Sequence, residues 1–299
     1  MSYATVNGIQ IAYEEDGSTD APAVLLIHGL GMPLTGWPQG WRHYLVTQGY
    51  RVICLDNRDA GQSDILDHYG LPSPFDIAKA SLLKKRIRSA YSLKDMAADA
   101  IGIMDHLAID QAHIIGASMG GMISQRLAIH YPDRVKSLTP IMTMTGDRDI
   151  PYPSMKVQWV MLSQPRNGDR QAMMNHSEKL WRAIGSPAYP PSDEYLKAYI
   201  NGLLDRGLHP KGAMRQLAAI LAEEDRGPLL TKLDVPTLVI HGEADPLLNV
   251  TCGKQVAEKI PGAKIHIEPG MGHDFPEPIE EKLLKLITEH LKAADNRPE

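Results

Sequence analysis

The feature that most constrains the fold of this chain is a series of six short apolar runs, each followed by a polar or glycine-rich turn. The runs cover residues 23–27, 51–55, 112–115, 135–142, 237–240 and 263–267. They show no alternation of apolar and polar side chains, which is typical of strands buried on both faces of a parallel sheet. Helical periodicity between most of them, as in residues 92–107, 119–130 and 279–291, predicts an α/β fold with a mostly parallel, doubly wound sheet.

The N-terminal segment predicts a different element, an antiparallel β-hairpin around the turn pair Asn7-Gly8. It has no basic start followed by an apolar stretch, as a signal peptide would, and no apolar run approaches the ~20 residues needed to span a bilayer. The formal net charge of -5 shows no basic surplus for nucleic acid or an anionic membrane. We therefore expect a cytoplasmic protein that binds neither, and the sequence leaves its oligomeric state open.

The most specific motif is G-A-S-M-G at residues 116–120, which lies between the apolar run 112–115 and the helical segment 119–130. A G-x-S-x-G motif at a strand-to-helix turn is typical of a nucleophile elbow, which lifts the serine out of the sheet. Glycine is needed at both ends because side chains there would collide with the neighbouring strand and helix. Ser118 is therefore the predicted nucleophile.

The serine needs two partners. Its hydroxyl becomes a strong nucleophile when a histidine accepts its proton and an acid fixes the tautomer of that histidine. With an elbow of this type, the acid follows the serine in the chain and the histidine comes last. Asp245 and His273 each follow a predicted strand, so both are expected beyond the carboxyl ends of strands, where open α/β sheets place their sites. Asp245 is the predicted acid, with Glu243 as the alternative.

Acyl transfer also needs backbone N–H donors for the oxyanion of the tetrahedral intermediate. In the elbow arrangement one donor belongs to the residue after the nucleophile, here Met119, and one to the loop after an early strand. That loop covers residues 28–31, so Leu30 is the predicted second donor. His28, which begins the loop, is interpreted as a structural histidine that bonds to nearby backbone.

Residues 144–228 interrupt the alternation of strands and helices. They contain proline-rich turns but no pattern of a buried strand. The segments with helical character are residues 155–162, 171–184, 193–204 and 211–223. We interpret residues 144–228 as a helical insertion into a core made of residues 1–143 and 229–299.

Taken together, these motifs resemble those of the α/β-hydrolase superfamily along nearly the whole chain. The resemblance rests on His28-Gly29 and on residues 56–63, 116–121, 241–245 and 272–273. Residues 56–63 are similar to the form found in bacterial esterases and in polyketide methylesterases of the aclacinomycin type. The resemblance implies that the helical insertion covers the site as a cap.

The predicted triad favours a serine hydrolase that cleaves a small-molecule carboxylic ester or lactone through an acyl-enzyme intermediate. This chemistry requires no metal ion or organic cofactor, and Cys54 and Cys252 lack the spacing of a metal site. A cofactor-free haloperoxidase and a carbon–carbon bond hydrolase share the triad and stay open as alternatives. Another alternative is a non-catalytic member of the fold that binds a small molecule. An aminopeptidase would need cap carboxylates to hold a substrate amine, such as those of residues 223–225.

The candidates for substrate contact are Trp159 and Trp181 in the insertion and Met271 just before His273. Aromatic side chains at such positions either line an acyl pocket or pack against neighbouring helices, and both alternatives stay open. Methionine is flexible and polarisable. Met119 beside the nucleophile and Met271 near the base therefore favour a soft, adaptable pocket.

Overall fold

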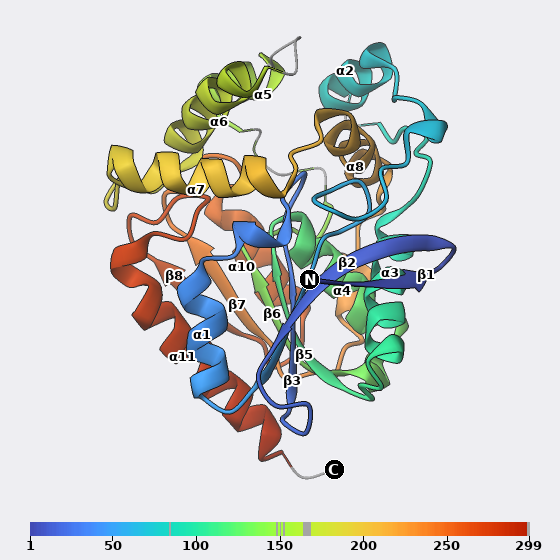
Figure 1. The fold of residues 1–299 in the computed structure, drawn as a ribbon, viewed down its shortest axis with the longest axis vertical. Coiled ribbons are helices and arrows are strands. Elements are labelled where there is room, and N and C mark those ends of the chain that lie inside the picture. The colour runs from blue at the N-terminus through green and yellow to red at the C-terminus, as the bar shows by residue number, and fades with distance from the viewer. Residues whose placement is uncertain (84, 148, 150, 152, 164–168, 298–299) are drawn as a thin grey trace.

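The computed structural model describes residues 1–297 apart from residues 84, 148, 150, 152 and 164–168. Within this part of the chain the strands form one eight-stranded sheet in the order β1-β2-β4-β3-β5-β6-β7-β8 (Figure 1). The strands are β1 (Ser2–Val6), β2 (Ile9–Asp16), β3 (Ala23–Ile27), β4 (Arg51–Leu55), β5 (Ala112–Ala117), β6 (Val135–Ile141), β7 (Leu238–Gly242) and β8 (Lys264–Glu268). Strand β2 pairs antiparallel with β1 and β4, and the pairs from β4–β3 to β7–β8 are parallel. The expected mostly parallel α/β fold is confirmed.

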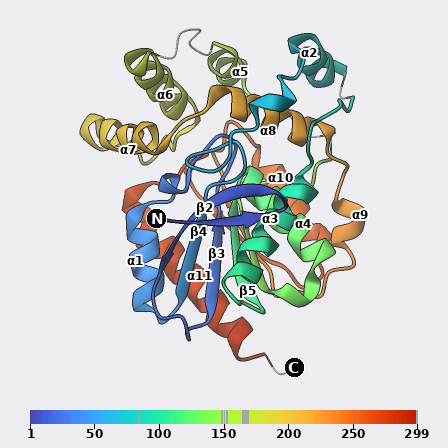
Figure 2. The same cartoon turned by 45° about the vertical axis from the view of Figure 1, so that its right-hand side comes forward.

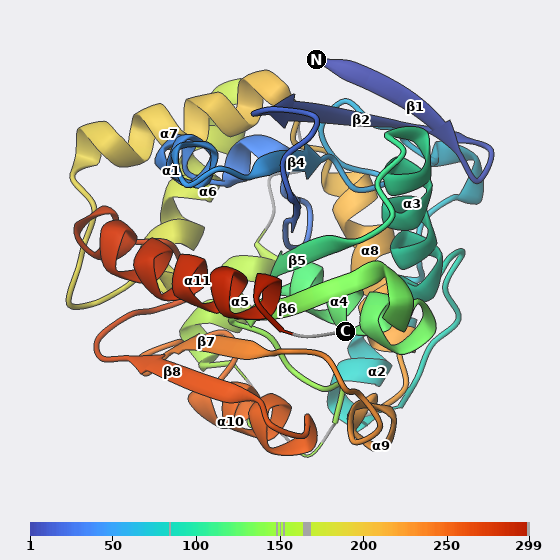
Figure 3. The same ribbon diagram turned by 90° about the horizontal axis from the view of Figure 1, so that it is seen from below.

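Different helices cover the two faces of this sheet. The helices outside the insertion are α1 (Gln39–Thr47), α2 (Pro74–Leu83), α3 (Leu93–His106), α4 (Met119–His130), α10 (Val250–Lys259) and α11 (Glu280–Asp295). In Figure 3, α1 and α11 lie on one side of the sheet and α3 and α4 on the other. Val24 and Leu26 of β3 pack with α1 and α11, whereas Leu25 and Ile27 pack with α3, α4 and α10. The apolar runs lack alternation because both faces of the sheet are buried.

The two edges of the sheet test the sequence predictions differently. At one edge the hairpin is confirmed, since Val6 pairs with Ile9 across a turn in which Asn7 and Gly8 both have positive φ. At the other edge, the prediction that the last run is buried on both faces is wrong. Among the described residues, strand β8 has no neighbour beyond it in the sheet, and its Ile265 is 41% exposed.

The helical region, as we call residues 144–228, lies between β6 and β7 in the chain. It contains α5 (Met155–Leu162), α6 (Arg170–Ile184), α7 (Asp193–Arg206), α8 (Pro210–Ala222) and the first part of α9 (Gly227–Leu230). Figures 1 and 2 show α5, α6, α7 and α8 together above one end of the sheet. The predicted boundary at residue 228 falls inside α9. Residues 148, 150, 152 and 164–168 of the predicted insertion, and 298–299 of the predicted core, lie outside the described residues.

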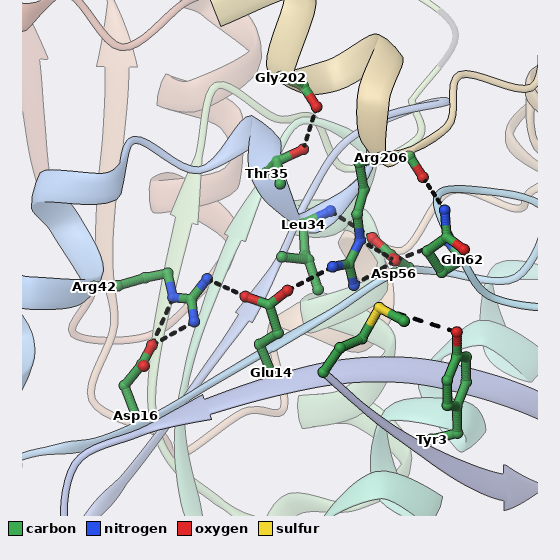
Figure 4. A network of polar contacts seen from close by, with 11 residues as sticks. Tyr3, Glu14, Asp16, Leu34, Thr35, Arg42, Asp56, Gln62, Gly202 and Arg206 are labelled. Atoms are coloured by element: carbon green, nitrogen blue, oxygen red, sulfur yellow. Dashed lines mark hydrogen bonds and ion pairs between the residues drawn. The ribbon is translucent and has the colours of Figure 1, made fainter.

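The end of α7 meets the core through a polar network, seen from close by in Figure 4. The Arg206 guanidinium donates to the carboxylates of Asp56 and Glu14. Asp56 is fully buried and also accepts the Leu34 N–H at 2.6 Å. On its other side Glu14 accepts from Arg42 of α1 at 2.7 Å. The network ties α7 to the first strands.

Among the described helices, none is both long enough and apolar enough to cross a membrane.

Candidate active site

Ser118 is the single residue between β5 and α4, and its backbone is strained. Its φ of 56° and ψ of -117° lie in a region that L side chains rarely adopt. A Cβ on Gly116 would collide with the Gly120 carbonyl, and a Cβ on Gly120 would collide with the Ile27 carbonyl. The turn is therefore possible only with glycine at both positions, and it presents Ser118 at the end of the sheet in the manner of a nucleophile elbow.

The three predicted triad side chains lie in hydrogen-bond contact. His273 Nε2 is 3.0 Å from Ser118 Oγ, and His273 Nδ1 is 2.7 Å from Asp245 Oδ2. His273 and Asp245 are both buried. Glu243, the alternative acid, is exposed. The geometry therefore places Asp245, and not Glu243, against the histidine.

The Asp245 carboxylate is held from several directions. Its Oδ1 accepts the N–H groups of Leu247 and Leu248 at 2.9 and 2.8 Å. His241, which the sequence analysis did not include among the site residues, places Nε2 3.5 Å from Asp245 Oδ2 and 2.8 Å from the Leu248 carbonyl. Burial lowers the pKa of His241, so the ring is neutral and donates through Nε2. These contacts fix the carboxylate that faces His273.

The two backbone segments predicted to hold an oxyanion flank the serine. A Cβ on Gly29 would lie 3.1 Å from the Cβ of Ser118, so the loop with Leu30 passes directly beside the nucleophile. Met119 is the first residue of α4. Its N–H therefore has no partner within the helix and stands at the positive end of the helix dipole.

His28 stabilises the loop after β3. Burial lowers its pKa to about 4, so the imidazole is neutral at neutral pH and Nδ1 can accept a hydrogen bond. Nδ1 accepts the Gly29 N–H at 2.6 Å, and the His28 carbonyl accepts from Asn57 Nδ2 at 3.1 Å. The ring also packs edge-on against Trp37, with centroids 5.1 Å apart. The interpretation of His28 as a histidine bonded to nearby backbone is confirmed.

The loop that carries the histidine is held by a serine that the sequence analysis missed. Ser186, just after α6, donates its hydroxyl to Asp274 and accepts the Gly272 N–H at 2.8 Å. The His273 N–H donates to the Ile184 carbonyl at 2.7 Å. Burial raises the pKa of Asp274, an effect that the hydrogen bonds from Ser186 oppose. The end of α6 and the residues just after it thus hold the backbone of Gly272 and His273 and the side chain of Asp274.

The three substrate-contact candidates lie in different environments. Trp181 lines a cavity of ≈ 130 Å³ whose wall includes Asp274, the residue after His273. The aromatic side chains around this cavity are Trp181, Tyr189, Tyr195, Tyr199 and Phe275. Trp159 is 73% exposed on α5, and Met271 is fully buried in a core cluster. The structure brings Trp181 alone of the three to the wall of this cavity.

The carboxylates of residues 223–225, which an aminopeptidase would need for a substrate amine, all have partners in the chain, but only Glu223 is buried. The partners are Arg126 and Arg226 for Glu223, Arg86 for Glu224 and the Gly227 N–H for Asp225. A carboxylate that is already neutralised by arginine does not attract a substrate cation strongly. This arrangement disfavours Glu223 as the anchor of a substrate amine.

Two other kinds of site, a metal centre and a cysteine nucleophile, depend on how the Cys, His, Asp and Glu side chains are placed. Within the described ranges, no group of three or more His, Cys, Asp or Glu side chains is arranged to hold a metal ion. Cys54 and Cys252 are buried free thiols. Burial raises the pKa of each to about 12, so both are protonated at neutral pH and are not nucleophiles.

Comparison with known proteins gives a consistent picture. The family model described as "alpha/beta hydrolase fold" matches residues 22–277. The chain is 28% identical to rhodomycin D methylesterase from Streptomyces peucetius over 295 residues, covering 92% of each protein. It is 29% identical to a 2-hydroxy-6-oxononadienedioate/2-hydroxy-6-oxononatrienedioate hydrolase from Paraburkholderia xenovorans, covering 95% of this chain and 91% of that protein.

Solved structures show the same fold. An enol-lactonase from Burkholderia xenovorans matches with a TM-score of 0.76 and 23% identity, covering 97% of this chain and 100% of that chain. An esterase from Exiguobacterium antarcticum matches with a TM-score of 0.77 and 21% identity, covering 97% of this chain and 99% of the other.

Proposed function

The chain belongs to the α/β-hydrolase fold family, and we propose that it is a serine hydrolase that cleaves a carboxylic ester or lactone through an acyl-enzyme intermediate. The observation that carries the proposal is the hydrogen-bonded series from Ser118 Oγ to His273 to Asp245, at 3.0 and 2.7 Å. The similarity to rhodomycin D methylesterase supports an ester as the substrate class.

In the first half of the proposed reaction, Ser118 Oγ attacks the carbonyl carbon of the ester. His273 Nε2 accepts the hydroxyl proton, and the Asp245 carboxylate stabilises the resulting imidazolium through Nδ1–H. The oxyanion that forms accepts hydrogen bonds from the N–H groups of Leu30 and Met119. One such donor is worth about 3–4 kcal/mol of transition-state stabilisation.

In the second half, the intermediate collapses and the leaving alcohol takes the proton from His273 Nε2, which leaves an acyl group on Ser118. A water molecule then gives a proton to His273 and attacks the acyl carbonyl. The second tetrahedral intermediate releases the carboxylic acid, and the proton returns to Ser118 Oγ. The buried carboxylate of Asp245 keeps its charge throughout.

A second candidate is a carbon–carbon bond hydrolase. It is supported by the similarity to the 2-hydroxy-6-oxononadienedioate/2-hydroxy-6-oxononatrienedioate hydrolase. The same serine and histidine would serve that reaction, so the substrate, and not the triad, distinguishes the two candidates.

The test is a substrate panel: nitrophenyl esters of increasing acyl length, a methyl ester, a lactone and 2-hydroxy-6-oxononadienedioate. We expect turnover of the esters or the lactone, lowered about 10⁶-fold in kcat by Ser118→Ala and about 10⁴-fold by Asp245→Asn. Glu243→Gln is the matched control and should keep wild-type activity. Turnover of the dienedioate alone would establish the second candidate. No turnover of any substrate would favour a non-catalytic binding protein.

A further inference from the structure

The Gln216 side chain lies where α8 meets the loop that carries one proposed oxyanion donor. Gln216 is fully buried. Its Oε1 accepts the Gly31 N–H at 2.6 Å, and its Nε2 donates to the Arg58 carbonyl at 2.7 Å. Both ends of the amide are therefore used, and one side chain joins the loop after β3 to the loop after β4. The helical pattern of residues 211–223 predicts a helix for this residue and indicates no role for it.

The loop fits closely against α8 at Gly31. This glycine has a φ of +67°, and a Cβ on it would lie 3.0 Å from the Cβ of Ala213. Leu30 is thus held between Gly29, which adjoins the nucleophile, and Gly31, which is bonded to Gln216. Because the peptide unit is planar, fixing the Gly31 N–H also fixes the Leu30 carbonyl and limits rotation of the Leu30 backbone.

Gln216 can hold the loop because its own helix is held firmly. The neighbouring Arg215 donates from Nε and Nη2 to the two carboxylate oxygens of Asp59 at 2.9 and 2.6 Å. Tyr91 donates to the same carboxylate at 2.7 Å. All three side chains are buried. A paired, planar contact of this kind fixes orientation as well as distance, so α8 has a defined position against the core.

We propose that Gln216 is a positioning residue that orients the Leu30 N–H toward the oxyanion. This inference rests on the proposed function, because it concerns the donor that acts in the proposed reaction. Gln216 does not touch the reacting atoms. It acts through the Gly31 peptide, from a helix of the region that the resemblance identifies as a cap.

Loss of the amide should affect the transition state more than substrate binding. Without Gln216 Oε1 the Gly31 N–H loses its buried partner. The Met32 N–H still donates to the Gly29 carbonyl at 3.2 Å, so the Leu30 backbone is held less tightly but is not free. The oxyanion forms only during the reaction. A poorly oriented Leu30 N–H therefore lowers kcat and leaves KM nearly unchanged. Because a small misplacement of a reacting group costs up to about 100-fold, we expect kcat to fall about 10- to 100-fold.

The test compares Gln216→Met with Gln125→Met in the full-length protein. Both glutamines are fully buried, and both use the two ends of the amide in hydrogen bonds. Gln125 lies on α4 and bonds to Arg226 and the Met144 carbonyl, so it controls for the loss of a buried amide. The measurements are kcat, KM, the inhibition constant of an alkyl boronic acid that forms a tetrahedral adduct with serine, and the unfolding temperature.

We expect Gln216→Met to lower kcat and to weaken the boronic acid by a similar factor, with KM held, while Gln125→Met changes only the unfolding temperature. Equal kcat and equal boronic acid inhibition in both variants would overturn the role of Gln216. Failure of the proposed function would look different, since the wild-type protein would then turn over neither the esters nor the lactone.

Discussion

Two parts of the helical region meet the core in very different ways. In the inner part (residues 184–188 and 206–228), Arg215, Gln216 and Arg226 are buried and bond to the core. In the outer part (α5 and residues 170–183), Trp159 is 73% exposed and Met155 is 87% exposed. The inner part also supplies the contacts to the loops with Leu30 and His273, whereas the outer part lies farther from the sheet (Figure 2).

This difference shows that a segment inserted between two strands need not be a separate lid throughout. The inner part is packed and hydrogen-bonded as a core element is, so changes there should alter stability or the geometry of the site. Exposed side chains of the outer part, such as Trp159 and Met155, face solvent, so changes to them should alter neither stability nor the geometry of the site.

The largest effect on stability is expected at Arg226. This fully buried guanidinium bonds to Glu223 at 2.7 Å, to Gln125 at 3.0 Å and to the Met144 carbonyl at 2.8 Å. Arg226→Met should lower the free energy of unfolding by about 3–5 kcal/mol. The substitution removes a positive charge from the buried Glu223 carboxylate and a donor from the Gln125 amide oxygen and the Met144 carbonyl. Denaturant unfolding measures this.

The control for that experiment is Arg182→Met in the outer part. Arg182 pairs with Glu178 and Asp193 at the surface, so its loss should cost at most about 1 kcal/mol. Equal losses in the two variants would contradict the distinction between the inner and outer parts.

A smaller effect, on activity, is expected at Ser186. Ser186→Ala removes the hydroxyl that bonds to Asp274 and to the Gly272 N–H, so the histidine loop becomes less well held. We expect kcat to fall about tenfold, which corresponds to about 1.4 kcal/mol, with KM unchanged. Steady-state kinetics on a nitrophenyl ester measures this.

The control is Ser163→Ala, at the exposed end of α5. An equal loss of kcat in this variant would exclude a role of Ser186 that is specific to the histidine loop.

The smallest effect is expected at Trp159. Trp159→Ala should change the free energy of unfolding by no more than about 0.5 kcal/mol and should leave kcat and KM for short esters unchanged, because the side chain is exposed. A marked rise in KM with long acyl chains would show instead that α5 contacts the substrate, and would restore Trp159 as a substrate-binding residue.

Much of the fold was predictable because it depends on local patterns. Buried parallel strands give uninterrupted apolar runs, and the G-x-S-x-G motif of the elbow is contiguous in sequence, although the space that excludes a side chain at Gly120 is filled by the distant Ile27 carbonyl. Asp245 and His273 could be predicted because each follows such a strand. The exposure of Ile265 could not, since it depends on the order of strands in the sheet, which places β8 at an edge.

The contacts of the helical region could not be predicted for a similar reason. Periodicity shows that residues 211–223 form a helix, but it does not show which loop that helix meets, so Gln216 was indistinguishable from an ordinary helical glutamine. Ser186 lies in a turn and has no pattern of its own. Trp159 shows the converse, because a tryptophan suggests burial and this one is exposed.

The place of the helical region in the chain also bears on synthesis. Strand β6 pairs with β5 on one side and with β7 on the other, but β7 follows only after residues 142–237. At about 5–20 residues per second, the ribosome needs roughly 5 to 20 seconds to make that stretch. During this interval the nascent chain carries an unpaired, apolar strand edge of the kind that promotes aggregation. The helices that complete the site are thus made while the sheet beneath them is still open.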